Sequence, residues 1–443
     1  MLAAGLVAWC ASALAAAPVA HDFTLANGLQ VIVQEDHRAD VAVVQIWYKV
    51  GAADEQDGAT GVSHALEHMM FKRTKNLATG EFSRLVAAQG GRENAFTTAD
   101  YTTYFQQWSA ANVELSFKLE ADRMQNLLLD PDEFKNERKV IREERRLRTD
   151  DSAQAAALET VLATTWQTSP YRQPVIGWAA DIDQMQLPEL AAWYHRFYTP
   201  NNAILVVVGN VQLAAIQKLA EQYFGPLEKR ELPLRKTRPE VAQRGAKRLQ
   251  ITSNKIQLPI LLMNYKTPGL VQIKQAEPPI EEWEVYALDV LAATLDGGAS
   301  ARFARELVRG GLALGASASY QSTSRLWDLF TFGGTPRHAH SLPELEQAIK
   351  AQINGIQTKP PTAAELERIK TGVIAEAIYQ QDSMSGQAMI IGSLVVVGLD
   401  WRLKDQYADK IQAVTPAQVQ AVARKYLVDE HSTIAYVMPE QPK

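Results

Sequence analysis

The chain has almost no cysteine. Its single cysteine, Cys10, lies in the apolar stretch 1–17, which is rich in small residues and contains the cleavage-type tripeptide Ala-Leu-Ala at 13–15. Such a stretch is too short to span a membrane and is typical of a secretory signal, although a positively charged start is missing. We predict a signal peptide over residues 1–20 and a periplasmic or secreted protein; the alternative is a buried or disordered tail. Without Cys10, the mature chain has no thiol, disulfide or cysteine metal ligand.

The chain also lacks a strong excess of charge and a long apolar run. With 45 basic and 50 acidic residues its net charge is −5, and no basic run suggests a polyanion site, so we expect no nucleic-acid partner. The apolar run 389–399 is too short for a membrane span and predicts a core helix. The length of 443 residues favours two or three domains.

Histidine is scarce, with eight in the chain, yet two stand four residues apart in the stretch 61–71. On a helix, His64 and His68 share one face and can bind the same metal ion. Glu67 lies between them, close enough to reach a water on that metal. The pattern His-x-x-Glu-His is a zinc-hydrolase signature, the inverse of His-Glu-x-x-His. The alternative is a helix with two solvated histidines, so the motif needs a third ligand.

The predicted helix 131–148 offers that ligand. At about 100° per residue, Glu137 and Glu144 fall on its apolar face, whereas Glu143 points about 120° away from Glu137, towards arginines. The apolar residues expected on this face are Phe134, Val140, Ile141 and Leu147. A buried carboxylate is costly unless it is paired or bound to a metal. Pairing with nearby arginines is the alternative, but the combination with the two histidines favours zinc.

The remaining pattern predicts sheets and an internal duplication. Strand-like runs at 23–33 and 41–50 suggest an antiparallel start, and 90–105 predicts an edge strand that could pair with an extended peptide. A helix, a polar turn and a strand follow one another at 187–208 and again at 415–437, which indicates duplication. The counterpart of the His64 helix in the second half, 284–295, has no histidine.

With these residues in place, the chain resembles the pitrilysin/insulinase family of zinc metallopeptidases. It resembles the branch of processing-peptidase-like subunits of about 50 kDa, and its own mass is 49.0 kDa. The motifs that carry the resemblance are Asn-Gly-Leu at 27–29, His-x-x-Glu-His at 64–68, Gly-Gly-x-x-Asn-Ala-x-Thr at 90–97, the Glu137/Glu144 helix, Ile-Gly-Trp at 176–178 and Pro-Asn-Asn-Ala at 200–203.

The resemblance implies an α+β fold and a division of the chain. Two homologous α/β-sandwich halves, each a mixed, largely antiparallel sheet packed with helices, would form half of a clam-shell. We expect a zinc-binding catalytic domain at 21–228, a linker at 229–248 and a homologous domain without a metal site at 249–443. The linker stretch is rich in Pro, Lys and Arg and has no apolar periodicity.

The resemblance also implies residue roles. His64, His68 and Glu144 would bind one Zn²⁺ per chain, Glu67 would be the catalytic base, and Glu137 would support catalysis from behind the ligands. The main chain of Asn94, Ala95, Phe96 and Thr97 would hold the substrate extended. We therefore expect a zinc-dependent endopeptidase subunit that hydrolyses extended peptides or small unfolded polypeptides. The alternative is a proteolytically silent binding or scaffold subunit; such relatives typically lose a member of the His-x-x-Glu-His set, which this chain keeps whole.

One departure from the family pattern suggests a partner. Active relatives carry an arginine and a tyrosine, seven residues apart, that help bind substrate and stabilise the oxyanion. The matching positions here are Leu307 and Leu314, which cannot donate a hydrogen bond. The alternatives are that this alignment with the family pattern is out of register, or that Tyr320 takes the place of the tyrosine. We expect a heterodimer in which a homologous zinc-less subunit supplies the Arg/Tyr pair.

Overall fold

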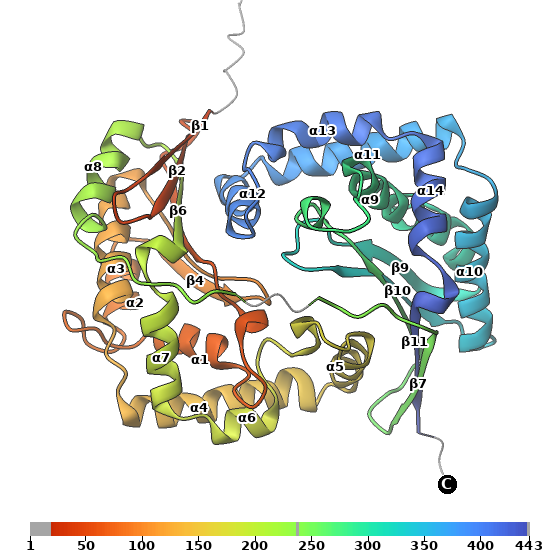
Figure 1. Cartoon of the computed structure of the whole chain (residues 1–443), viewed down its shortest axis with the longest axis horizontal. Helices are drawn as coiled ribbons and strands as arrows, with labels where there is room; N and C mark the ends of the chain where they lie inside the picture. The colour runs from red at the N-terminus through yellow and green to blue at the C-terminus, as the bar shows by residue number, and fades with distance from the viewer. Residues whose placement is uncertain (1–18, 236–238, 441–443) are drawn as a thin grey trace, which may run out of the picture.

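The first half of the chain is built on a six-stranded mixed sheet. The computed structural model describes residues 19–235 and 239–440, and Figure 1 shows the two halves side by side. The strand order is β1-β2-β6-β3-β5-β4, so β4 lies at an edge. The strands are β1 (Ala20–Thr24), β2 (Gln30–Glu35), β3 (Ala42–Tyr48), β4 (Arg92–Thr97), β5 (Thr102–Trp108) and β6 (Ala203–Gly209). The central strands are apolar and fully buried because both faces of the sheet are covered.

The second half repeats this arrangement without the extra edge strand. Its order is β7-β11-β8-β10-β9. In each half the last strand is parallel to one neighbour and antiparallel to the other: β6 to β2 and β3, and β11 to β7 and β8. The strands are β7 (Lys247–Ser253), β8 (Ile260–Thr267), β9 (Ala313–Tyr320), β10 (Asp328–Pro336) and β11 (Ser432–Pro439). The predicted two-half α+β fold is confirmed.

Helices cover the sheets, and the two helix–strand repeats are α7–β6 and α14–β11. The helices of the first half are α1 (Val62–Met69), α2 (Glu81–Ala88), α3 (Val113–Asn126), α4 (Pro131–Arg145), α5 (Ala153–Thr165), α6 (Ala179–Gln184), α7 (Leu187–Phe197) and α8 (Leu213–Tyr223). Those of the second half are α9 (Glu282–Asp296), α10 (Leu342–Thr358), α11 (Ala363–Gln380), α12 (Met384–Val396), α13 (Leu403–Ala413) and α14 (Pro416–Tyr426). Among the residues described, none of these helices is both long enough and apolar enough to cross a membrane.

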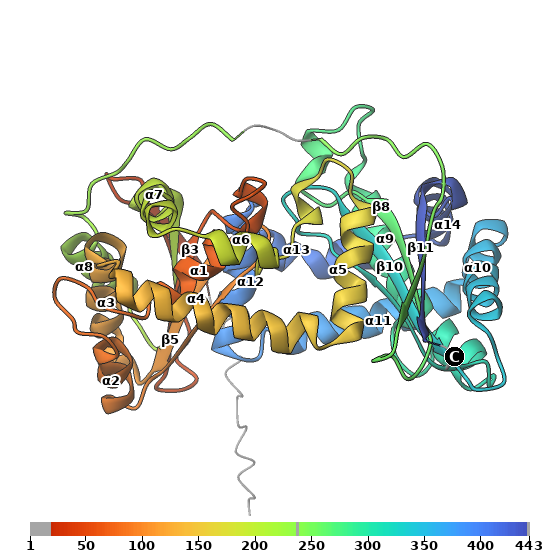
Figure 2. The ribbon, with the colours of Figure 1, turned by 90° about the horizontal axis from the view of Figure 1, so that it is seen from below.

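One helix of each half packs on the sheet of the other half. Helix α12 packs on β3 and β6 of the first sheet, where Ile391 joins a cluster with Trp47 and Val206 (Figure 1). Gly392 allows this close approach, because a Cβ atom there would lie 2.1 Å from the Trp47 ring. In return, α5 packs on β7 and β11, with Ala157 against Val437. Figure 2 shows α5 standing against the second sheet. The two halves therefore share their cores.

Two residues expected on the buried face of α4 are exposed. The buried stripe of α4 contains Phe134 and Ile141, whereas Val140 and Leu147 are 51% and 58% exposed. Val140 directly precedes Ile141 and lies about 100° from it around the helix, which turns its side chain off the packed stripe. Leu147 lies beyond the last α-helical turn, in the π-helix Arg146–Asp150, where the regular 3.6-residue spacing ends. The prediction for these two side chains was wrong.

Candidate metal centre

The helix that carries the two histidines is fixed at its first turn. Its N-cap, Gly61, has φ = 86°, and a Cβ atom there would lie 2.5 Å from the Ile176 carbonyl oxygen. The buried carboxylate of Glu55 accepts hydrogen bonds from the N–H groups of Gly61 (2.7 Å) and Ser63 (2.8 Å). These are N–H groups that a helix start leaves without partners. Burial raises the pKa of Glu55 to about 7, against the lowering effect of these two bonds.

Helix α4 brings its carboxylate to the face of α1 that bears the histidines. One ligand atom each of His64, His68 and Glu144 lie within 4.8 Å of one another. Glu144 Oε2 is 3.3 Å from His68 Nε2 and 3.7 Å from His64 Nε2. The other oxygen, Oε1, is 2.9 Å from Arg148, so the carboxylate faces an arginine and the histidines at once. Two imidazoles and one carboxylate, with a position left open, form a donor set known from catalytic zinc sites.

The imidazole of His64 is in a state that suits a metal. Burial, followed by the nearby His68, lowers the pKa of His64 to about 3, so its ring is neutral and has a free lone pair. Its Nδ1 atom is buried without a hydrogen-bond partner among the described residues. The residues present therefore fit a zinc ion.

A second carboxylate holds the other histidine from behind. Glu137 Oε1 lies 2.8 Å from His68 Nδ1, and Glu137 Oε2 lies 2.6 Å from Lys72 Nζ. Burial lowers the pKa of His68, but the bond to Glu137 and the surrounding carboxylates outweigh it, and the net shift is upward. Metal-binding histidines usually have such a carboxylate on the second nitrogen, where it fixes the ring. The sequence did not single out Lys72, although it stands four residues after His68.

The expected base lies beside this group. Glu67 is 9% exposed, and its Oε2 accepts a hydrogen bond of 2.5 Å from the hydroxyl of Thr97. Burial raises the pKa of Glu67, and the bond from Thr97 opposes this shift without cancelling it. A buried carboxylate with a raised pKa next to metal ligands is suited to take up a proton.

The four residues expected to hold substrate form the edge strand β4. Asn94, Ala95, Phe96 and Thr97 pair with β5 on one side only, and α1 packs beside the strand. The Ala95 N–H donates to the side chain of Asn94 at 2.9 Å, so an added strand would replace this local bond. An edge next to the metal-binding face can accept an extended chain by main-chain pairing. The side chain of Thr97, however, turns to Glu67, which the sequence did not reveal.

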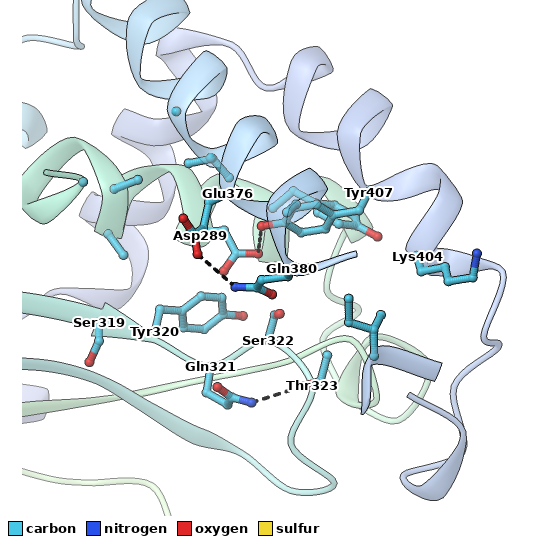
Figure 3. Close-up of a pocket in the computed structure, with 18 of the residues that line it drawn as sticks. Asp289, Ser319, Tyr320, Gln321, Ser322, Thr323, Glu376, Gln380, Lys404 and Tyr407 are labelled. Carbon is cyan, nitrogen blue, oxygen red and sulfur yellow. Dashed lines mark hydrogen bonds between the residues drawn. The ribbon is translucent and has the colours of Figure 1, made fainter. Parts of the chain in front are cut away.

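The second half has a cavity in the corresponding place. It measures about 710 Å³ and is lined by residues of α9, β9, α11 and α13 (Figure 3). Glu376 follows the N-cap of α11, Thr362, by 376 − 362 = 14 residues, just as Glu144 follows the N-cap of α4, Asp130, by 144 − 130 = 14. Asp289 also faces this cavity, where burial raises its pKa to about 7. No histidine lines it, so the described residues do not repeat the metal-binding group.

The positions that would carry the Arg/Tyr pair have no donor. Leu307 is 3% exposed in the core of the second half, and Leu314 is 51% exposed on β9. The hydroxyl of Tyr320, the alternative donor, donates to the carbonyl oxygen of Pro268 at 2.5 Å. Its hydroxyl is thus already engaged within the second half.

The fold is that of an M16 peptidase, and the chain belongs to that family. Residues 30–178 match the profile described as insulinase (peptidase family M16), and residues 184–373 match the peptidase M16 inactive domain. The zinc protease PqqE of Helicobacter pylori is 32% identical over 430 residues, which cover 95% of this chain and 93% of that protein.

Solved structures agree. A protease from Helicobacter pylori has a TM-score of 0.88 and 31% identity, covering 96% of this chain and all of that one. The periplasmic protease PqqL of Escherichia coli has a TM-score of 0.78 at 18% identity and shows the fold alone; the match covers 94% of this chain and 47% of that chain. The predicted resemblance to the pitrilysin/insulinase family is confirmed.

Proposed function

We propose that this chain is a zinc-dependent endopeptidase subunit that hydrolyses extended peptides or small unfolded polypeptides. The observation that carries the proposal is the convergence of His64, His68 and Glu144 on one point, with Glu67 beside them. The zinc-protease relatives of the family support a peptidase. Residues 184–373, most of which lie in the second half, match an inactive domain, and this fits the lack of histidines around the corresponding cavity.

The geometry suggests how the residues divide the work. When bound, zinc would supply Lewis acidity, polarising the scissile carbonyl and making water easier to deprotonate. Glu67 would take the proton from that water and pass it to the leaving amine. Glu137 would keep the His68 ring in place, and the neutral His64 would need no deprotonation to bind. The edge strand β4 would hold the peptide by its main chain, so selection by sequence should be loose.

Replacement of the base tests this proposal. Glu67→Gln removes the proton acceptor but no metal ligand, so we expect one zinc per chain and a loss of turnover by several orders of magnitude. Zinc content by atomic emission and cleavage of a quenched peptide measure the two effects. A metal-free variant, or one with near-normal turnover, would show that the roles are wrongly assigned. A wild-type chain that holds zinc but cleaves nothing, even with a partner, would support the silent-subunit alternative.

We also propose a heterodimer with a homologous zinc-less subunit. Leu307 and Leu314 give this chain no donor for the oxyanion where relatives have one, so a second chain would supply an arginine and a tyrosine across the clam-shell. The PqqL chain is about twice as long as its match to this chain, which fits pairing of two such units. Mixing purified subunits tests the idea: the chain alone should bind zinc and cleave poorly, and the homologue should restore activity. Full activity of the isolated chain would contradict it.

We propose a periplasmic location, in line with the predicted signal peptide. Residues 1–18 of that prediction lie outside the described residues. Support comes from PqqL, a periplasmic protease of the same fold. Fractionation of cells that express the full chain would check it, and retention of uncleaved protein in the cytosol would count against it.

A further inference from the structure

The hydroxyl of Thr97 belongs to the end of a tight hairpin. Thr97 is the last residue of β4, and Thr98 to Tyr101 form the turn into β5. Within the turn, Thr98 N–H donates to the Tyr101 carbonyl at 2.8 Å, and the Thr98 hydroxyl accepts from the N–H groups of Asp100 and Tyr101 at 3.1 Å each. The turn is therefore held together by its own hydrogen bonds, and Thr97 directly precedes it. Any contact that holds the turn also places the Thr97 hydroxyl.

One such contact comes from the first half. The N–H groups of Ala52 and Ala53 donate to the carbonyls of Thr98 (3.0 Å) and Ala99 (2.7 Å). Gly51 allows the approach, because a Cβ atom there would lie 2.4 Å from the Thr98 oxygen. This side of the turn is fixed by backbone alone.

The other contact comes from the second half, across the junction of the two sheets. The loop between β9 and β10 brings the Arg325 N–H to 2.8 Å from Asp100 Oδ2 and the Leu326 N–H to 3.0 Å from the Tyr171 hydroxyl. Tyr171 donates to the same carboxylate oxygen of Asp100 at 2.6 Å. Thus the hairpin loop of the second half meets the equivalent hairpin turn of the first half.

The Arg325 side chain closes this contact into a buried ion cluster. Its guanidinium lies 3.0 Å from Asp54 and 3.4 Å from Asp100, and Arg235 also binds Asp54 at 3.0 Å. The side chain of Arg325 is only 14% exposed, and those of Asp54 and Asp100 are 7% and 9% exposed. Removing one partner of a buried ion pair leaves the other charge uncompensated, so the turn should loosen when Arg325 is lost.

We propose that Arg325 is a positioning residue for Glu67: by anchoring the β4–β5 turn, it holds the Thr97 hydroxyl on the carboxylate. Arg325 touches neither the metal ligands nor the edge strand, so it acts only through the turn and Thr97. The bond from Thr97 occupies Oε2 of Glu67 and thereby restricts the rotation of this carboxylate. The inference rests on the proposed role of Glu67 as the base. It gives the half without a metal a direct part in preparing that base.

The variants for the test separate anchoring from folding. Arg325→Met removes the charge, and Tyr171→Phe removes a single hydroxyl from the same contact. Arg402→Met is the matched control, because Arg402 also joins the halves through Asp22, at 2.9 Å, but far from the turn. Thr97→Val removes the hydroxyl at nearly constant shape, and Thr97→Ser restores it. All variants are compared at equal zinc content.

The kinetic result expected is a selective fall in kcat. Thr97→Val should lower kcat about 10- to 100-fold with little change in KM, and Thr97→Ser should recover most of it. Arg325→Met should lower kcat about 3- to 30-fold, Tyr171→Phe less, and Arg402→Met not at all. When Thr97→Val is already present, Arg325→Met should lower kcat little further, because both substitutions act through the same hydroxyl. Fully additive losses, or a loss confined to KM, would overturn the proposal.

A second readout does not depend on activity. In the metal-free protein, hydrogen exchange of peptides that span residues 94–104 should become faster in Arg325→Met and Tyr171→Phe, and stay unchanged in Arg402→Met. Unchanged exchange in all three would overturn the anchoring step. A wild-type chain that has no peptidase activity even with its partner subunit would instead contradict the proposed function, and the exchange result would still decide the anchoring.

Discussion

Two neighbouring glutamates on α4 allow a sharp test of the metal centre. Glu144 points to the histidines, 3.3 Å from His68 Nε2, and its side chain is 17% exposed. Glu143, one residue earlier, is 54% exposed and pairs with Arg146, whose hydrogen bond lowers the pKa of this glutamate. Glu144→Gln and Glu143→Gln make the same chemical change in the same helix. Only the first should affect zinc.

The expected magnitude follows from the contacts. Residues that merely support a metal ligand change metal affinity about 10- to 100-fold when they are replaced. Glu137, bonded to His68, belongs to this group, so Glu137→Gln should fall in that range. Glu144→Gln removes the only anionic donor of the three and should weaken zinc binding by more than about 100-fold, or about 3 kcal/mol. Glu143→Gln removes an exposed ion pair away from the site and should leave zinc affinity unchanged.

The assay is competition for zinc with a fluorescent chelator, on metal-free proteins whose folding has been checked by circular dichroism. The three variants should rank Glu144, Glu137, Glu143 in order of decreasing effect. Equal losses for Glu143→Gln and Glu144→Gln would refute the reading of the helix face. If Glu137→Gln lost more zinc affinity than Glu144→Gln, Glu137 would be the ligand and Glu144 the supporting residue.

Two further changes test the second half. Gly392→Ala places a Cβ against Trp47 and should destabilise the protein by about 1–3 kcal/mol, as measured by urea unfolding. The control Gly372→Ala, in open space on α11, should leave the stability unchanged. An unchanged stability of Gly392→Ala would contradict the close packing. The pKa of Asp289 is raised to about 7 on folding, so the folded state holds its proton longer than the unfolded state and wild-type stability falls as pH rises from about 4 to 7. Asp289→Asn lacks this loss, so its stability relative to wild type should grow by about 3 kcal/mol over that range. A pH-independent difference would contradict the shift.

The sequence was informative where helical spacing alone determines which side chains share a face. The four-residue spacing of His64 and His68 and the seven-residue spacing of Glu137 and Glu144 each place two side chains on one helix face, whatever the rest of the chain does. The structure brings His64, His68 and Glu144 together, with Glu137 on the second nitrogen of His68. The same argument failed for Leu147, because α4 passes into a π-helix just before it and the period no longer applies.

Contacts between distant segments could not be predicted in this way. Helix α12 is apolar over most of its surface, which indicates burial but not the sheet on which it packs. Its place on Trp47 of the first sheet depends on both halves being folded. The same holds for Arg325, whose partners Asp54 and Asp100 lie more than 200 residues away. A contact between residues so far apart in the chain leaves no periodic pattern in the sequence.

The packing of the second half also bears on the missing arginine. Leu307 is 3% exposed and belongs to the core cluster of that half. An arginine at this position would bury a charge, which is costly without a partner. Leu307→Arg would therefore place an unpaired charge in this core. What this half keeps are contacts that the first half needs: α12 on the first sheet and Arg325 at the β4–β5 turn. These contacts agree with the proposed dimer, in which another subunit would supply the oxyanion donors.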